Sequence, residues 1–166
     1  MIKTAEYIPE IIKGFEGYVK ISELRKNIKN VPQKRGVYII YSDLENVPHF
    51  NEKGGYKSRK GKSTTVSIET LNSIWVEKAN VIYIGKAGGT GKKATIQSRL
   101  KQYMKFGESK TVSHWGGRYI WHIQNYDNLL VAWKTSDKDE PRVVEEKMIK
   151  EFEDIYGKIP FANCCH

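Results

Sequence analysis

Two stretches, GVYIIY at residues 36–41 and VIYIG at residues 81–85, decide the centre of the fold. Both consist mostly of β-branched and aromatic side chains, which favour strands over helices. A glycine begins the first stretch and another ends the second. We therefore predict two strands here, with the second stopping at Gly85.

Helical periodicity surrounds these strands. Apolar residues at 21, 24 and 28 indicate a short amphipathic helix, residues 68–75 carry one apolar face, and residues 94–105 form a helix with a basic outer face. Residues 119–123 and 129–133 flank the turn 125–128 and predict a hairpin. Pro141 suits a helix start, so we expect a last helix from there to about Tyr156, followed by Gly157.

Length and composition indicate one globular domain over residues 1–166. Hydrophobic residues make up 39% and charged residues 28%, which excludes collagen-like sequences and wholesale disorder. No apolar run approaches the roughly 20 residues that span a bilayer, and the first residues lack an apolar signal core. The two cysteines are adjacent, Cys164 and Cys165, and cannot form a disulfide framework. We expect a cytoplasmic protein with no membrane partner.

Positive charge is concentrated in blocks. The chain has 28 Lys and Arg against 19 Asp and Glu, a formal net charge of +9. Residues 86–105 hold six cations and residues 53–62 hold five, and neither block contains an acid, whereas residues 137–154 hold eight acids. Blocks of a single sign are typical of a surface that binds the phosphates of a nucleic acid.

Common catalytic motifs are missing from the sequence. A phosphate-binding loop of the form G-x-x-x-x-G-K-[ST] is excluded, because Tyr56 and Lys86 stand where its first glycine is required. Zinc-hydrolase and serine-hydrolase motifs are likewise absent from the sequence. On the last helix, Glu145 has Ile149 and Phe152 at i+4 and i+7 and so borders the apolar face, whereas Glu146 faces water.

An ordered set of motifs remains, and together it resembles the GIY-YIG nuclease family. The set comprises Gly36-Val37-Tyr38, Tyr83-Ile84-Gly85-Lys86-Ala87, Arg99-Leu100-x-x-Tyr103, Glu145 and Pro160-Phe161-Ala162-Asn163. The second and third pieces look most like the incision domain of the bacterial nucleotide excision repair nuclease, and stand-alone restriction enzymes of the family are similarly short. The resemblance covers roughly residues 21–163.

The resemblance implies an α+β fold, a small antiparallel sheet flanked by helices. It also implies an endonuclease that hydrolyses phosphodiester bonds in DNA with Mg²⁺ or Mn²⁺. Residues 42–80, between the first two motif strands, are then a long basic insertion, much longer than the family's compact version. The first motif reads Gly-Val-Tyr, and some members carry His where Tyr103 stands.

Each motif residue has a role in the implied reaction. Glu145 would hold the metal, since a hard cation needs only one or two carboxylates, and Arg99 would grip the phosphate. Either Tyr38 or Tyr83 would deprotonate the attacking water, with Lys86, Arg99 and the metal favouring the phenolate. We slightly favour Tyr83, because Lys86 lies just beyond it.

Supporting and DNA-contacting residues complete the prediction. Tyr103 would form a hydrogen bond at the site, and Asn163 resembles the family's late asparagine. Basic side chains and one Ser-His-Trp-Gly-Gly-Arg loop are expected to contact DNA by phosphate binding and base stacking. These residues are Lys57, Arg59, Lys60, Lys62, Lys92, Lys93, Lys101, His114, Trp115 and Arg118.

Two other functions stay open. A catalytically silent DNA- or RNA-binding module would keep the fold and the basic surface, and a ribosome- or RNA-associated domain would not need Glu145 to face the basic cluster. Occupation of every motif position favours the nuclease. A homodimer remains an open alternative to a monomer.

Overall fold

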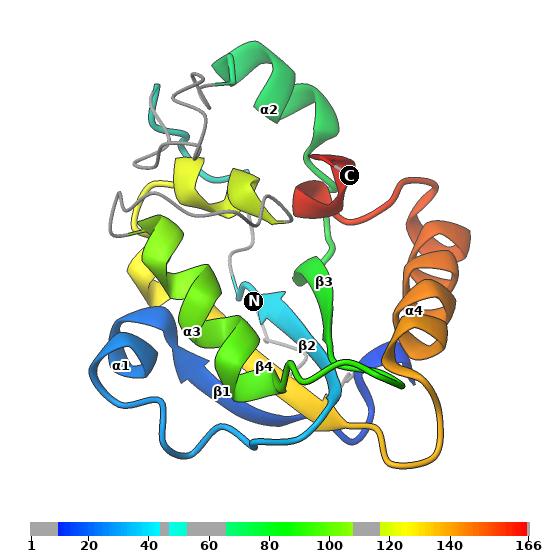
Figure 1. Cartoon of the computed structure of the whole chain (residues 1–166). Helices are drawn as coiled ribbons and strands as arrows, with labels where there is room; N and C mark the ends of the chain where they lie inside the picture. The colour runs from blue at the N-terminus through cyan, green and yellow to red at the C-terminus, as the bar shows by residue number, and fades with distance from the viewer. Residues whose placement is uncertain (1–9, 44–46, 53–65, 108–116, 166) are drawn as a thin grey trace.

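Four strands form one antiparallel sheet in the order β1-β4-β2-β3. The strands are β1 (Glu16–Lys20), β2 (Gly36–Tyr41), β3 (Val81–Ala87) and β4 (Leu130–Thr135). The computed structural model describes residues 10–43, 47–52, 66–107 and 117–165. Within them, the chain has an α+β fold, with helices on both faces of the sheet (Figure 1). The α+β class and the antiparallel sheet predicted from the sequence are confirmed.

Each face of the sheet has its own helices and its own part of the core. On one face, Tyr38 and Ile40 of β2 pack with α1 (Ile21–Lys26), α3 (Ile96–Gly107) and η2 (Arg118–His122). On the other face, Val37 and Ile39 pack with α4 (Pro141–Tyr156) and η1 (Glu10–Ile12). Successive β2 side chains point to opposite faces, so this strand is buried on both sides and joins the two parts of the core.

The predicted strands at the centre and the predicted last helix are confirmed. β2 spans the predicted residues, and α4 begins at Pro141 and ends at Tyr156, with Gly157 in the left-handed conformation after it. β3, however, does not stop at Gly85 but continues to Ala87, because Ala87 pairs with Gly36 at the far end of β2.

The predicted hairpin is wrong in its first half. Residues 118–122 form the short 3-10 helix η2, and η3 (Tyr126–Asn128) follows it, so only β4 is a strand. Three consecutive side chains of η2, Ile120, Trp121 and His122, are buried, which an alternating strand with one buried face could not achieve. The aromatic and β-branched composition therefore reflects burial here rather than an extended backbone.

The edge strand β1 was not predicted. Its side chains are exposed or half-buried, so the sequence shows no apolar alternation there. Its pairing with β4 is also irregular, with a register shift between Gly17 and Val19. Pairing with β4 therefore makes this segment a strand, and its own composition does not.

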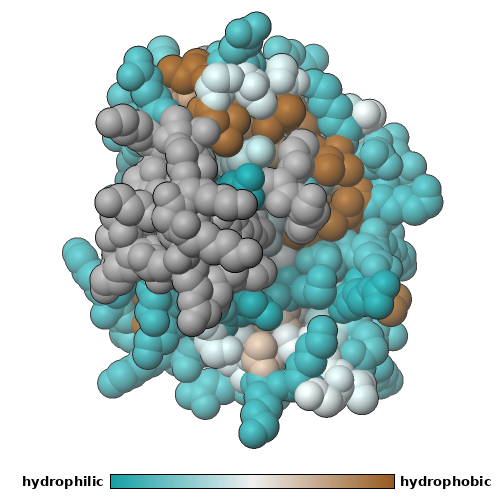
Figure 2. Space-filling view, turned by 45° about the horizontal axis from the view of Figure 1, so that its top comes forward, coloured by the Kyte–Doolittle hydropathy of each residue, from teal (hydrophilic) through white to brown (hydrophobic). Residues whose placement is uncertain are grey.

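The ends of the long segment between β2 and β3 pack against the domain. Trp75, which caps α2 (Ile68–Ile74), forms an aromatic cluster with Phe50 and with Phe161 of η4 (Phe161–Cys165). Among the residues that Figure 2 colours, most are hydrophilic, and the hydrophobic ones gather toward the end that carries α2. No helix in the described part of the chain is long and apolar enough to cross a membrane.

Candidate active site

Three tyrosines that the sequence singled out meet on the α3 side of the sheet. Tyr38 comes from β2, Tyr83 from β3 and Tyr103 from α3, and all three are buried. Their ring centroids lie 5.6–6.3 Å apart in pairs. The fold therefore gathers into one cluster side chains that are far apart in the sequence.

Gly85 allows the ring of Tyr38 to lie across β3. The two residues are cross-strand partners, and a Cβ added at Gly85 would lie 2.6 Å from the Tyr38 hydroxyl oxygen. Any side chain here would collide with the tyrosine ring. The glycine after Tyr83 and Ile84 thus has a steric role in placing the tyrosine of the neighbouring strand.

Tyr38 is influenced by charges from both sides of the sheet. Burial raises the pKa of Tyr38 well above its usual value of 10.0. The positive charge of Arg99 and a hydrogen bond with Tyr83 lower the pKa in part, while the negative charge of Glu145 raises it. The net direction is opposite to the lowered pKa expected from basic neighbours, because loss of water around the ring outweighs them.

Lys86 and Glu145 form an ion pair on the α4 side of β3. The Lys86 Nζ donates to the Glu145 Oε1 at 3.1 Å, and Glu145 is only 7% exposed. A carboxylate so nearly buried requires such a partner. Glu146, by contrast, is exposed and pairs with Arg142 at 2.9 Å, so the predicted assignment of the two glutamates is confirmed.

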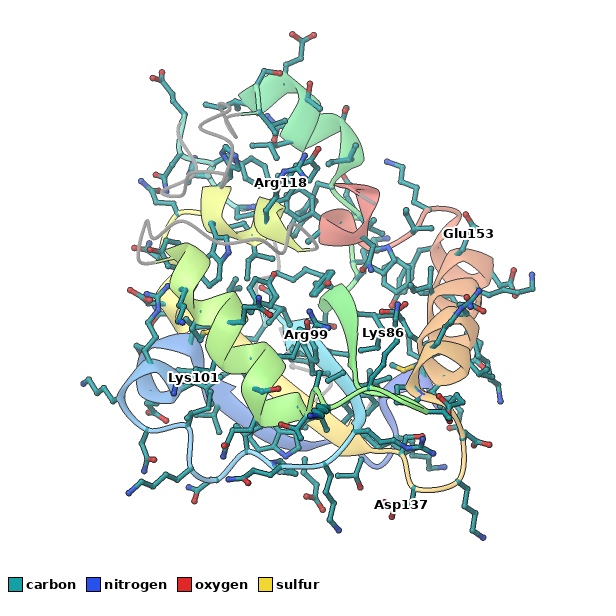
Figure 3. The ribbon with its side chains drawn as sticks, viewed as in Figure 1. Lys86, Arg99, Lys101, Arg118, Asp137 and Glu153 are labelled. Carbon is teal, nitrogen blue, oxygen red and sulfur yellow. The ribbon has the colours of Figure 1, made fainter. Side chains whose placement is uncertain are left out.

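The side chains of Arg99 and Lys86, the two cations predicted at the site, lie on opposite sides of β3. In Figure 3, Arg99 lies between α3 and β3, whereas Lys86 lies between β3 and α4. Because β3 is an edge strand, the two faces of the sheet meet along it. The site is therefore built around β3 rather than on one face.

Asn163 fixes the position of β3. Its side-chain Nδ2 donates to the Ile84 carbonyl and its Oδ1 accepts from the Ile84 N–H, both at 2.9 Å. The amide thus pairs with both backbone groups of Ile84, as a neighbouring strand would. Its predicted support of the site takes the form of a structural clamp.

Tyr103 also has a structural partner. Its hydroxyl donates to the backbone carbonyl of Gly117, and its ring packs edge-on against Trp121 at 5.3 Å. This side chain is fully buried. It therefore ties α3 to the start of η2 and packs the two other tyrosines from above the sheet.

Only part of the predicted DNA-contacting set can be placed. Lys92, Lys93 and Lys101 are exposed, and Arg118 is half-buried with its guanidinium 5.1 Å from the centroid of the Tyr119 ring. The remaining predicted residues lie outside the described part of the chain: Lys57, Arg59, Lys60, Lys62, His114 and Trp115.

A divalent cation at this site would depend on one protein carboxylate. Among residues 10–43, 47–52, 66–107 and 117–165, no group of three His, Cys, Asp or Glu side chains could hold a metal ion. Glu145 and water molecules would then be the ligands, and Mg²⁺ accepts such a set because it keeps several waters. The donor chemistry fits Mg²⁺, although the cation would compete with Lys86 for the carboxylate.

A polar junction beside the site was missed by sequence reasoning. Glu140 accepts hydrogen bonds from the Thr90 N–H and hydroxyl and from Arg35 Nη1. These contacts, those of Thr90 first, hold the pKa of Glu140 below its usual value. The junction ties the loop after β3 to the start of α4, and no periodic signal in the sequence connects its three members.

Comparisons of the chain with family models, with curated proteins and with solved structures found no match.

Proposed function

We propose that the protein is a metal-dependent endonuclease of the GIY-YIG type that hydrolyses phosphodiester bonds in DNA. The observation that carries this proposal is the convergence of motif residues around β3. Lys86 and Glu145 are in contact, and the hydroxyl of Tyr38 is influenced by both Arg99 and Glu145. The two motif strands β2 and β3 also pair directly, as the family resemblance implies.

Arg99 is the residue that would bind the scissile phosphate. A guanidinium presents several N–H donors in a fixed plane and keeps its charge at all ordinary pH values. Charge-assisted hydrogen bonds strengthen as negative charge develops on the phosphate oxygens. Arg99 would in this way stabilise the transition state more than the ground state.

Tyr38 and Tyr83 would handle the proton of the attacking water. The raised pKa of Tyr38 means that it holds its own proton at neutral pH in the free protein. To act as a base, Tyr38 must first release this proton to solvent, so its pKa must fall when the site is loaded; the hydrogen bond with Tyr83 favours this loss, because it lowers the pKa of Tyr38. Both tyrosines therefore remain candidates for the general base.

Glu145 would hold Mg²⁺ or Mn²⁺. When bound, such a cation supplies a Lewis acid that polarises the phosphate and stabilises the leaving oxygen. In the free protein Lys86 neutralises the Glu145 carboxylate and fixes its orientation toward β3. The ion pair thus keeps the carboxylate in place despite its burial.

The proposal is tested by plasmid cleavage with the Glu145→Gln variant and a matched Glu146→Gln control. Outer-sphere partners of a metal contribute roughly 10–100-fold to activity, so loss of a ligand should lower cleavage by more than about 100-fold. Glu146→Gln, on the exposed side of the same helix, should cleave like the wild type. EDTA should abolish cleavage by the wild type.

DNA binding, measured by fluorescence anisotropy without metal, separates the alternatives. We expect Glu145→Gln to bind DNA nearly as well as the wild type, because the cation acts mainly in the reaction. Equal cleavage by Glu145→Gln and the wild type would remove Glu145 from the mechanism. A wild type that binds DNA and never cleaves it would instead support the silent binding module.

A further inference from the structure

A second group of cations lies at the end of α1 and on the segment that joins α1 to β2. Residues 24–42 contain five cations and no acid, and residues 78–107 contain seven cations and no acid. Of these two segments, only residues 86–105 of the second belong to a basic block predicted from the sequence. The structure brings the two acid-free segments together at the first turn of α3.

Hydrogen bonds fix the first segment to α3. The Gln97 side-chain Nε2 donates to the carbonyls of Ile28 and Val31 at 3.2 and 3.0 Å. The N–H groups of Ile96 and Gln97 donate to the carbonyls of Lys34 and Pro32 at 2.8 and 3.1 Å. Figure 1 shows this segment passing the start of α3 on its way to β2.

These bonds decide how an anion could be held here. The N–H groups of Ile96 and Gln97 in the first turn of α3 already have carbonyl partners, so they are not free to bind a phosphate. Any anion at this place must therefore be bound by side chains. The backbone that carries those side chains is held in one position.

The same arrangement fixes the loop after β3. Arg35 donates to Glu140 at 2.9 Å, and Glu140 accepts from the Thr90 N–H at 3.0 Å. Arg35 also donates from Nε to the Ser136 carbonyl at 2.9 Å. Arg35 and Glu140 thus link the first segment to the loop that leads through Lys92 to α3.

Four lysines project from these two fixed segments, and all four are exposed: Lys29, Lys34, Lys92 and Lys93, which we call the lysine rim. None of them forms an ion pair with another residue that the structure describes. Glu140, the acid that links these segments, is already paired with Arg35. The like charges of the four lysines repel one another, and a polyanion would relieve that repulsion.

We propose that the lysine rim binds the phosphate backbone of duplex DNA outside the scissile phosphate. This inference rests on the proposed function and deepens it, because it makes an extended duplex the substrate rather than a short oligonucleotide. Lysine ammonium groups contact phosphates as point charges and carry no base information. The rim would therefore position DNA without selecting a sequence. It would place the duplex relative to Arg99, which lies about one turn after Ile96, the first residue of α3.

The test is the salt dependence of binding to a 30-bp duplex, measured by fluorescence anisotropy in EDTA so that cleavage plays no part. The rim variant carries Lys29→Gln, Lys34→Gln, Lys92→Gln and Lys93→Gln. The control variant removes the same charge near α4: Lys138→Gln, Arg142→Gln, Lys147→Gln and Lys150→Gln. Each lost phosphate contact lowers the slope of log affinity against log salt by about 0.9, so four contacts correspond to about 3.6.

We expect the slope to fall by up to about 3.6 in the rim variant and to change little in the control. A rim variant with Arg at all four positions should keep the wild-type slope, and circular dichroism should show all variants folded. Equal falls in both variants would show a general charge effect and overturn the rim. Wild-type binding with an unchanged slope in the rim variant would overturn the rim and leave the nuclease proposal standing. No binding by the wild type would refute both.

Discussion

The two helices that cover opposite faces of the sheet carry their positive charge differently. Cations on the outer face of α4 pair with acids four residues further on, as in Arg142–Glu146 at 2.9 Å and Lys147–Glu151 at 3.9 Å. α3 has no acid at all along its twelve residues. Charge on α4 is therefore neutralised locally, whereas α3 has no acid of its own to neutralise its cations.

On the inner face of α4, one acid pairs with another element instead of with its own helix. Glu145 turns away from the paired surface and meets Lys86 of β3. An acid of the neutralised helix is thus paired with a cation of β3, on the α4 side of that strand (Figure 3). The difference teaches that net charge is less informative than which charges are already paired.

The largest expected effect comes from removing a tyrosine hydroxyl on the α3 side. If Tyr38 or Tyr83 is the general base, its change to Phe should slow cleavage by on the order of 10²–10⁴ while the ring packing persists. Tyr156→Phe, whose ring packs against Phe152 on the α4 side, is the control and should cleave normally. Single-turnover cleavage rates provide the measurement, and normal rates for both test variants would place the base elsewhere.

The pH dependence of the rate distinguishes the two tyrosines. Only the deprotonated base accepts a proton, so the rate should rise about tenfold per pH unit below the pKa of that base. Because burial raises the pKa of Tyr38 above 10.0, a Tyr38 base predicts a rise that continues past pH 10. The rise should be lost in Tyr38→Phe. A wild-type plateau near neutral pH would contradict Tyr38 as an unassisted base.

A smaller effect, on stability, is expected where the side chain of Asn163 holds the edge strand β3. Asn163→Ala removes both partners of the buried Ile84 backbone groups, and each unsatisfied group costs about 1–3 kcal/mol, so the free energy of unfolding should fall by roughly 2–6 kcal/mol. Asn80→Ala loses one half-buried bond, to the Ser42 carbonyl, and should cost about 1 kcal/mol. Urea denaturation measures both. Equal losses of unfolding free energy in Asn163→Ala and Asn80→Ala would show that the Asn163 side chain does not hold β3.

The smallest effect on stability is expected from an exposed ion pair on α4. Arg142→Ala breaks an exposed ion pair with Glu146, and such pairs contribute about 0–1 kcal/mol. We expect the free energy of unfolding to change by less than about 0.5 kcal/mol and DNA binding to stay as it is. A marked loss of DNA affinity in this variant would mean that α4 also contacts the substrate.

Local signals in the sequence predicted the parts of the fold that local forces control. β2 and β3 were found because their composition suits a buried sheet, and α4 was found because Pro141 and Gly157 mark its ends. β1 was missed because an exposed edge strand shows little pattern of its own. The segment 118–122 was mistaken for a strand because burial, rather than extension, selects its aromatic residues.

In the candidate site, too, the sequence predicted only features that depend on spacing within one element. The spacing of Ile149 and Phe152 after Glu145 was enough to separate it from Glu146, because i+4 neighbours share a helix face. No such spacing relates Lys86 to Glu145 or Gln97 to Val31, which come from different elements. Contacts of this kind depend on how the elements pack.

By itself the sequence determined which chemical groups are available: the ordered tyrosines, Arg99, the inward glutamate and the acid-free basic segments. The tertiary structure decided which of these groups meet and in what environment. It placed Tyr38 against Gly85 and out of water, which raises the pKa of its hydroxyl, and it brought Lys86 to Glu145. Desolvation and ion pairing depend on neighbours from other elements, and periodicity within one element carries no information about them.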